Sequence, residues 1–366
     1  MLNINALLLN LGRYHALVQR TRTKKLSFLQ IRRKFYADYW SDAAKKVGAD
    51  IRDVGSDYFL ISKNNRSVLV QFHQVSIDTY LNLKLVTSKT MIQKILAKGG
   101  YPIPRFKIFD ISSLNKARDW MAEQQGSFVI KPSRGSGGRG ITTGITNDKR
   151  LKKATVAAAA SLKKESLIIE QQVKGDSYRL LYLNGKLIDV IQRCRPTVVG
   201  NGKSSIRELI ADENRQRHET GTSRSFNPLT VDLDCLFYLE DHHMNLNTVP
   251  KQGEKAMVKN VANENAQRDN FSVRARAHPY YQELGKKISE SLSLNLIGID
   301  IMAEDVAAPL DTQGGVINEI NIPPGLHYHE LIDNQQDKAD IGQQVLEFIF
   351  TKSAIDPTIP SDLCPF

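Results

Sequence analysis

The chain has 366 residues, of which 41% are hydrophobic and 24% are charged, and its formal net charge is +11. This composition is that of an ordinary globular protein with room for two or three buried cores, and no run of eighteen apolar residues predicts a membrane span. Three cysteines (Cys194, Cys235, Cys364) show neither zinc-ligand spacing nor a disulfide pattern, which favours a reducing, cytoplasmic compartment.

Positive charge is concentrated at the start of the chain. Residues 1–35 contain eight Lys and Arg residues and no Asp or Glu, after a Leu-rich beginning. We interpret residues 1–31 as a basic N-terminal segment, first as a solvated helix, with an interfacial amphipathic helix or a targeting peptide as alternatives. We expect no nucleic-acid binding, and only weak contact of this segment with a membrane or a partner.

Residues 32–85 have the pattern of a small α/β domain. Apolar residues recur first at helical spacing and then in the runs "SDYFLIS" and "RSVLVQF", which predict a helix followed by a pair of strands. The next helix is expected to begin after Ser88 as its N-cap and to stop at Gly99 and Gly100.

The stretch "FVIKPSRGSGGRGI", residues 128–141, joins an apolar strand to a glycine-rich loop. Lys131 stands at the strand end, and bare backbone amides in such a loop can point at an anion. The loop fits neither a Walker A motif nor a dinucleotide-binding fingerprint. A flexible glycine hairpin is the alternative, but the lysine and the two arginines favour a phosphate-binding loop.

The middle of the chain is rich in predicted strands. A helix over "DKRLKKATVAAAASLKK" is followed by strands in "LIIEQQV", "YRLLYL" and "KLIDVIQRC", and Asn184-Gly185 predicts a hairpin turn between the last two. Serines before "IRELI" predict another helix. Residues 211–285 carry little pattern, and "ELGKKISESLSL" and "ADIGQQVLEFIF" predict helices further on.

Two apolar strands near the end of the chain carry hard oxygen ligands. Glu319 and Asn321 are two residues apart and so face the same side of a strand, and Asp300 can join them from the preceding strand. Such ligands suit Mg²⁺ that also bridges nucleotide phosphates. A solvent-facing strand edge or a buried polar pair is the alternative, but acids in buried strands are costly without a compensating partner.

These passages, in this order, resemble the ATP-grasp superfamily, and in particular the ATP-grasp part of cyanophycin synthetases and bacterial bifunctional glutathione synthetases. The resemblance covers most of residues 86–330. It implies an α+β ATP-grasp fold, in which two α+β subdomains (86–165 and 166–330) grip ATP. A small N-terminal α/β lead-in domain (32–85) precedes this region, and a C-terminal helix and tail (331–366) follow it.

The resemblance also implies a role for individual residues. Lys89 and Lys131 match phosphate-binding lysines, Glu170 and Val173 match the adenine hinge, and Arg193 matches an arginine near the transferring phosphate. The implied nucleotide-binding set is Lys89, Lys131, Ser133, Gly135, Ser136, Gly137, Gly138, Gly140, Glu170, Gln171, Val173 and Asp176; the implied catalytic set is Arg193 and Lys131; the implied metal ligands are Asp300, Glu319 and Asn321.

Two departures from the family pattern affect what can be carried over. An acid usually stands directly before the Tyr-Arg of "YRLL", but here Ser177 occupies that position and Asp176 precedes it. Relatives carry a Ser-Thr-Gly-Gly loop where this chain reads "VANENAQRDNFSVRARAHP", so the identity of the substrate is not carried over. Arg268, Arg274 and Arg276 in this stretch either meet a substrate carboxylate or form a solvated basic surface, and His329 is expected to pack rather than to catalyse.

The implied function is an ATP-dependent carboxylate-amine ligase that forms an amide or peptide bond through an acyl phosphate and releases ADP and phosphate. The implied cofactors are ATP and two Mg²⁺ ions, with Mn²⁺ as a substitute, and the substrates are amino acids or short peptides. By analogy the chain is expected to form a homo-oligomer. The alternative is a catalytically inactive, ATP-binding regulatory or scaffold protein of the same fold.

Overall fold

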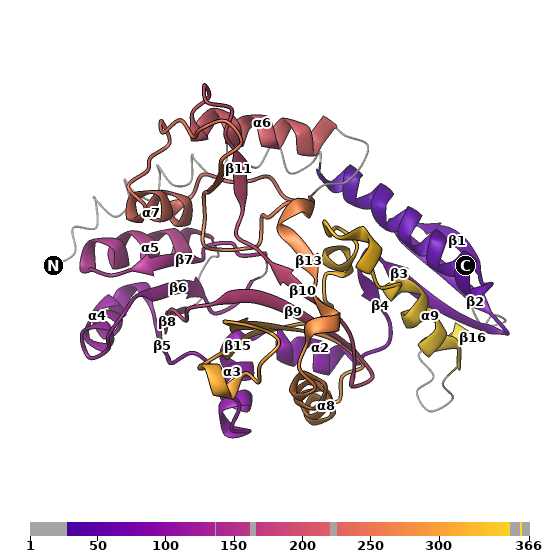
Figure 1. Ribbon diagram of the computed structural model, residues 1–366. Coiled ribbons are helices and arrows are strands. Elements are labelled where there is room, and N and C mark those ends of the chain that lie inside the picture. The colour runs from indigo at the N-terminus through magenta and orange to yellow at the C-terminus, as the bar shows by residue number, and fades with distance from the viewer. Residues whose placement is uncertain (1–27, 136, 162–165, 220–224, 352–358, 361–366) are drawn as a thin grey trace. The chain divides into compact units, whose positions relative to one another are not determined.

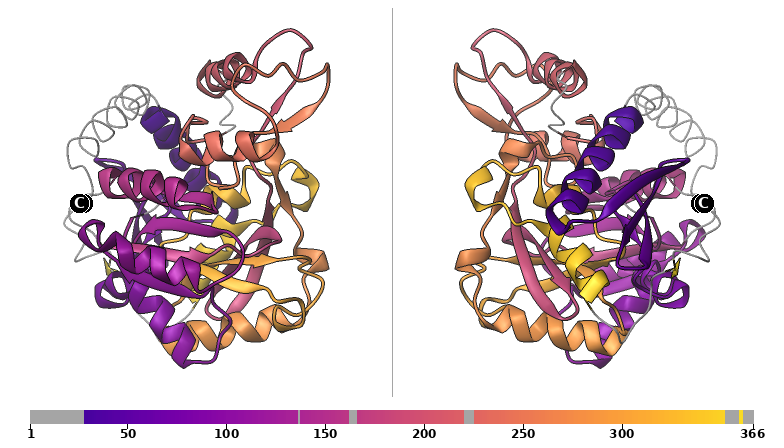
Figure 2. Two further views of the ribbon diagram at one scale, coloured as in Figure 1. Left: turned by 90° about the vertical axis from the view of Figure 1, so that its left-hand side faces the viewer. Right: turned by 90° about the vertical axis from the view of Figure 1, so that its right-hand side faces the viewer.

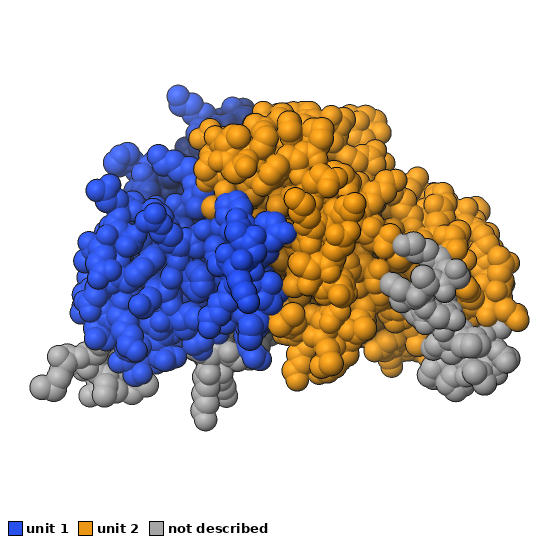
Figure 3. Space-filling view, turned by 90° about the horizontal axis from the view of Figure 1, so that it is seen from below, with its two compact units in different colours: residues 1–28, 88–174, 193–269 blue, residues 29–87, 175–192, 270–366 orange. Residues whose placement is uncertain are grey.

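The computed structural model describes residues 28–135, 137–161, 166–219, 225–351 and 359–360 (Figure 1). They divide into two compact units, each assembled from separate stretches of chain (Figure 3). Unit 1 holds Ser88–Lys174 and Arg193–Asp269, and unit 2 holds Leu29–Thr87, Gly175–Gln192 and the described residues from Asn270 onward. None of the helices in the described part is long and apolar enough to cross a membrane. The basic segment predicted over residues 1–31 lies almost wholly outside the described residues, and the predicted domain boundaries stay predictions.

Unit 1 is built around an antiparallel sheet with the strand order β5-β8-β6-β7. Its helices and strands are α3 (Lys89–Lys98), β5 (Phe106–Phe109), α4 (Leu114–Ala122), β6 (Phe128–Pro132), β7 (Thr142–Ile145), α5 (Asp148–Ser161), β8 (Leu167–Gln171), β11 (Thr197–Val199), α6 (Ile206–Glu219), α7 (Leu233–Asp241) and β12 (Lys255–Met257). Short 3₁₀ turns lie at Ile111–Ser113 and Gln267–Asp269.

The core of this sheet is filled from α4, α5 and α7. It contains Phe109, Leu114, Ala117, Phe128, Ile130, Ile145, Leu151, Ala154, Ala158, Leu167, Ile169 and Phe237. Every residue of β6 is buried, so this strand is held on both faces up to the point where the glycine-rich loop begins. The loop therefore starts from a rigid position in the sheet.

A second, smaller core in unit 1 lies between α6, α7 and the antiparallel ribbon β11-β12. It contains Val198, Ile206, Leu209, Ile210, Leu229, Cys235, Tyr238, Leu239, Ala256 and Val258. In both views of Figure 2, α6 and this ribbon lie in the pink-to-orange part of the chain at the top. Since α7 contributes to both cores, it connects this lobe to the sheet of unit 1.

Unit 2 contains two sheets. Its elements are a helix over residues 28–47, β1 (Asp50–Gly55), β2 (Tyr58–Lys63), β3 (Arg66–Gln71), β4 (Gln74–Val75), α2 (Tyr80–Val86), β9 (Asp176–Leu183), β10 (Lys186–Arg193), β13 (Asn270–Ser272), α8 (Tyr280–Leu292), β14 (Leu296–Ala303), β15 (Val316–Asn321), α9 (Ile341–Thr351) and β16 (Ile359–Pro360), with 3₁₀ turns at Arg274–Arg276, Asp311–Gln313, Leu326–His329 and Gln335–Asp337. One sheet has the order β1-β2-β3-β16, with β4 beside β3, and the other has the order β13-β10-β9-β14-β15.

The second sheet positions the predicted metal ligands. Its strand β14 pairs antiparallel with β9 on one side and with β15 on the other. In this register Asp300 lies opposite Arg179 of β9 and opposite Glu319 of β15. Because directly opposed residues share a face of a sheet, these three side chains form one row.

Most elements predicted from periodicity and turn signals are confirmed. Helix α3 has Ser88 as N-cap and Gly99 as C-cap, and the β9-β10 hairpin turns at Asn184 and Gly185, whose φ angles of 50° and 72° suit this dipeptide. Helix α6 begins with a capping arrangement, in which the Ser205 amide donates to Glu208 at 2.8 Å. In contrast, α7 and β12 fall in residues 211–285, where the sequence predicted no element.

A close contact between α8 and β9 provides a test of the packing in unit 2. A Cβ atom on Gly285 would lie 1.9 Å from a ring carbon of Tyr182, which is fully buried. We expect Gly285→Ala to destabilise the protein by about 1–3 kcal/mol, although alanine favours helices, because the overpacking outweighs the gain in propensity. Thermal unfolding measures the loss as a midpoint lowered by a few degrees.

The control is Lys287→Ala on the exposed side of the same helix, which should leave the midpoint nearly unchanged. A Gly285→Ala protein as stable as the parent would show that Tyr182 can move away at no cost, contrary to the packing described.

Candidate functional site

The glycine-rich loop leaves β6 in a backbone conformation that favours glycine. Its candidate residues Gly135, Gly137, Gly138 and Gly140 all have positive φ angles, of 107°, 68°, 67° and 74°. At its base Ser133 is buried, its amide donates to the Ser166 carbonyl at 2.9 Å, and its hydroxyl accepts from Ser166 at 3.0 Å. The loop thus has a fixed base, while the candidate Ser136 lies outside the described residues.

Lys131 and Glu170 form a buried ion pair in unit 1. Lys131 Nζ lies 2.6 Å from Glu170 Oε2, and both side chains are 5% exposed. They meet because β6 and β8 are neighbours in the sheet, and Gln93 also donates to the Glu170 carboxylate at 3.3 Å. The predicted phosphate lysine and the predicted hinge glutamate are therefore together, and the carboxylate supplies the countercharge that a buried lysine needs.

Three further candidates of unit 1 lie near these elements. Lys89 is the first residue of α3, and its backbone amide donates to the Ser133 carbonyl at 3.3 Å, which places it beside the base of the loop. Gln171 ends β8, where its amide donates to the Arg105 carbonyl at 2.9 Å. Val173 follows β8 and is half-buried. The structure thus brings Lys89 and Lys131 to the same end of the β6 strand.

Arg193 ends β10 and is buried, with 7% of its surface exposed. Its guanidinium donates through Nη2 to the carbonyl of Ala262. Ala262 belongs to the stretch that departs from the family pattern. The predicted catalytic arginine is therefore hydrogen-bonded to the backbone of that stretch.

In unit 2 the row formed by β9, β14 and β15 contains a buried ion pair. Arg179 reaches both oxygens of Asp300, through Nε to Oδ1 and through Nη2 to Oδ2 at 2.9 Å. Asn321 Nδ2 also donates to Asp300 Oδ2, at 3.2 Å. Burial alone would lower the pKa of Arg179, but the carboxylate of Asp300 outweighs it and raises this pKa.

The three predicted metal ligands therefore lie together on β14 and β15. Asp300 and Glu319 are opposite each other and Asn321 contacts Asp300. No group of three His, Cys, Asp or Glu side chains that could hold a metal ion occurs among the described residues. Two carboxylates and one amide fit Mg²⁺, because this ion takes few protein ligands and completes its shell with water and phosphate oxygens.

Asp176, the candidate for a ribose hydroxyl, is an exposed residue at the start of β9. Its Oδ2 accepts a hydrogen bond from Gln192 Nε2 at 2.7 Å, within unit 2. The carboxylate is accessible, but its predicted contact with ribose stays a prediction.

The arginines proposed for a substrate carboxylate have protein partners. Arg268 donates to Glu213 at 2.9 Å and to the Thr197 carbonyl at 2.8 Å. Arg276 pairs with Asp305 at 3.0 Å, and Arg274 donates to the Ile188 carbonyl at 3.2 Å.

Two buried charged residues, Arg179 and Asp189, were not among the residues predicted from the sequence. Arg179 lies in the quoted "YRLL" strand, and the signal that could have identified it is a charge in an otherwise apolar strand. Asp189 is fully buried, and it contacts His329 Nδ1 at 2.8 Å and accepts from Ser272 at 2.9 Å. His329 is fully buried beside Asp189, and its predicted packing role stays a prediction.

Comparison with known proteins finds similar sequences and folds, although no family model matches the chain. A cyanophycin synthetase of Geminocystis herdmanii (strain PCC 6308) is 30% identical over 272 residues, which are 74% of this chain and 31% of that protein. The glutathione biosynthesis bifunctional protein GshAB of Clostridium perfringens is 22% identical over 84% of this chain and 40% of that protein.

Among solved structures, the crystal structure of a bifunctional glutathione synthetase from Pasteurella multocida is similar, with a TM-score of 0.53 and 20% identity over 83% of this chain and 41% of that chain. The matched region covers only about a third of the length of the cyanophycin synthetase described above.

The Arg179–Asp300 pair provides a test of the row in unit 2. We expect Arg179→Met to destabilise the protein by about 3–5 kcal/mol, because it leaves the carboxylate of Asp300 buried without a countercharge. Denaturant unfolding measures this difference.

The matched control is Arg276→Met, which breaks an Arg–Asp pair whose side chains are 57% and 48% exposed. This change should cost less than about 1 kcal/mol. Equal losses in the two variants would contradict the burial of the Arg179–Asp300 pair.

Proposed function

Since the chain has the ATP-grasp fold and resembles cyanophycin synthetases and bifunctional glutathione synthetases, we propose that it is an ATP-dependent carboxylate-amine ligase. The predicted α+β ATP-grasp fold is confirmed. The reaction that we propose forms an amide or peptide bond through an acyl phosphate and releases ADP and phosphate.

The observation that carries this proposal is the set of oxygen ligands on β14 and β15. Asp300 and Glu319 are directly opposite each other, and the amide of Asn321 contacts Asp300. Phosphoryl transfer depends on neutralising and aligning phosphate oxygens, and Mg²⁺ would supply that neutralisation when held by these residues. An inactive scaffold would have no need to retain such a set, so the ligand set favours the ligase over the inactive alternative.

The residues of unit 1 fit the handling of phosphate groups. Lys131 stands near the end of β6, the backbone of Lys89 lies beside the base of the glycine-rich loop, and Arg193 ends β10. In the proposed reaction a substrate carboxylate oxygen attacks the γ-phosphorus and ADP leaves. An amine nitrogen then attacks the acyl carbon, loses its proton, and phosphate leaves.

We propose amino acids or short peptides as the substrates, because the names of the similar proteins refer to glutathione and cyanophycin synthesis. The particular carboxylate and amine are not carried over, since residues 259–279 depart from the family loop. Two Mg²⁺ ions, replaceable by Mn²⁺, are part of the proposal, as are a cytoplasmic location and a homo-oligomeric state.

The proposed reaction can be tested with pooled amino acids and dipeptides. We expect ADP release that is stimulated by a carboxylate and amine pair, with a condensed product detected by mass spectrometry. Lys131→Met should lower this rate by at least about a hundredfold, because it removes a cation that stabilises the transferring phosphate. No stimulated ADP release with any pair would favour the inactive scaffold.

The control for Lys131→Met is Lys107→Met, which removes an exposed lysine from β5, the edge strand of the same sheet. This variant should turn over ATP at the parent rate. A Lys131→Met protein that stays folded and matches its activity would refute the role of Lys131.

The metal assignment is tested by binding as well as by rate. We expect Glu319→Gln to weaken Mn²⁺ binding about tenfold or more, because a neutral amide replaces a charged ligand. Electron paramagnetic resonance of free Mn²⁺, measured with ADP present, follows the binding directly. Glu304→Gln, at an exposed position just after β14, is the control. Equal Mn²⁺ affinities in the two variants would remove Glu319 from the ligand set.

A further inference from the structure

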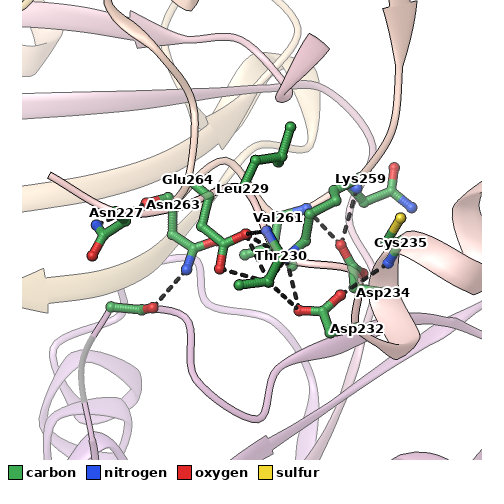
Figure 4. Close-up of polar contacts among 12 residues, drawn as sticks. Asn227, Leu229, Thr230, Asp232, Asp234, Cys235, Lys259, Val261, Asn263 and Glu264 are labelled. Atoms are coloured by element: carbon green, nitrogen blue, oxygen red, sulfur yellow. Dashed lines mark hydrogen bonds and ion pairs between the residues drawn. The ribbon is translucent and has the colours of Figure 1, made fainter. Parts of the chain in front are cut away.

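A short segment of unit 1, residues 259–264, is fixed by buried charges at its start. Lys259 is 1% exposed, and its ammonium group donates to Asp232 at 2.7 Å, to Glu264 at 2.9 Å and to the Thr230 hydroxyl at 3.1 Å (Figure 4). Burial alone would lower the pKa of Lys259, but the two carboxylates outweigh burial and raise it. The lysine therefore stays charged and holds both ends of the segment.

The same segment is bound to the strand that follows the glycine-rich loop. The buried carboxylate of Asp234 accepts from the amides of Asn260 and Val261, both at 3.0 Å. Its other oxygen accepts from the amide and the hydroxyl of Thr143 on β7, at 3.0 and 2.6 Å. One side chain thus joins the segment to β7.

The far end of the segment is held in a similar way. The Glu264 carboxylate accepts from the Thr230 amide at 2.8 Å, and the Glu264 carbonyl accepts from Arg217 at 2.8 Å. Arg217 is fully buried and also donates to the Asn227 carbonyl at 2.8 Å. With both ends fixed, the middle residues of the segment have little freedom to move.

These middle residues contact two candidate groups of the site. The Ala262 carbonyl accepts from Arg193. The side-chain amide of Asn263, which Figure 4 labels, donates to the Gly137 carbonyl. The next loop residue, Gly138, lies so close that a Cβ atom there would be 2.2 Å from Asn263 Nδ2. The glycine-rich loop therefore packs against Asn263 as well as hydrogen-bonding to it.

We propose that the 259–264 segment is a positioning element that holds Arg193 and the glycine-rich loop in register, with Asn263 as the positioning residue for the loop. This inference rests on the proposed function, because it assigns the loop to nucleotide phosphates. A loop of positive-φ glycines samples many conformations, and one fixed carbonyl restricts the directions of its neighbouring amides. The Asn263 contact thereby lowers the entropy cost of ordering the amides next to Gly137 around a phosphate.

The experiment compares Asn263→Asp with Asn201→Asp. Asn263→Asp keeps the shape of the side chain but cannot donate to the Gly137 carbonyl, and Asn263→Ala is a second, uncharged variant. Asn201 caps an exposed turn of the same lobe, where its side-chain oxygen accepts from the amides of Lys203 and Ser204. Since an aspartate retains that acceptor, Asn201→Asp should behave like the parent.

Two measurements are made on the full chain. Hydrogen exchange without nucleotide should be faster in both Asn263 variants, for the peptides that contain Gly137 and Gly138. The dissociation constant of Mg²⁺ with the non-hydrolysable analogue AMPPNP, measured by calorimetry, should rise about fivefold, the value of one lost hydrogen bond. Asn263→Gln, which retains an amide donor, should recover part of this affinity. Melting temperatures should fall by no more than the few degrees that one hydrogen bond is worth.

Any other result contradicts the loop contact, the positioning role or the proposed function, as follows. Unchanged exchange at the loop in both Asn263 variants would overturn the tether, whatever the ligase activity. Faster exchange with unchanged AMPPNP affinity would overturn the positioning role and leave the proposed function intact. A parent protein that binds no AMPPNP would overturn the proposed function, and the role of Asn263 in nucleotide binding would fall with it.

Discussion

The constraint that most shapes the candidate residues of each unit is the pairing of buried charges. Lys131 is buried with Glu170, and Arg179 with Asp300, and in both cases the partners come from neighbouring strands of one sheet. An unpaired ion in these positions would cost several kcal/mol, so each strand register that separates the partners is strongly disfavoured. The charged candidate residues thus also help to specify the register of the neighbouring strands.

The same ion pairs determine which contacts remain for a ligand of the proposed reaction. In the proposed reaction, a phosphate at Lys131 would meet an ammonium group already paired with Glu170, and a cation at Asp300 would meet a carboxylate already shared by Arg179 and Asn321. Binding must therefore add to these contacts or exchange for them, which limits the affinity. In return, the side chains are ordered before the ligand arrives, so less conformational entropy is lost on binding.

The sequence predicted what depends on neighbouring residues. Strands β6, β14 and β15 are short apolar runs with turn signals at their ends, and the Asp300, Glu319 and Asn321 set follows from the two-residue period of a strand. Partners were not predictable in this way, since Arg179 and Asp300 are 121 residues apart. The lobe with α7 and β12 was missed because its polar residues, such as Lys259 and Asp234, are buried as a network that no hydrophobic period reveals.

The 259–264 segment departs from the family pattern, and its side chains are bound within the protein. The segment overlaps the stretch where the family resemblance implies a Ser-Thr-Gly-Gly loop, and its Lys259, Asn263 and Glu264 side chains each have a protein partner. A side chain held by the protein is a poor selector of substrates, because a substrate would have to replace those contacts. In the proposed ligase this segment therefore acts as internal support, and the selection of substrates falls to residues outside it.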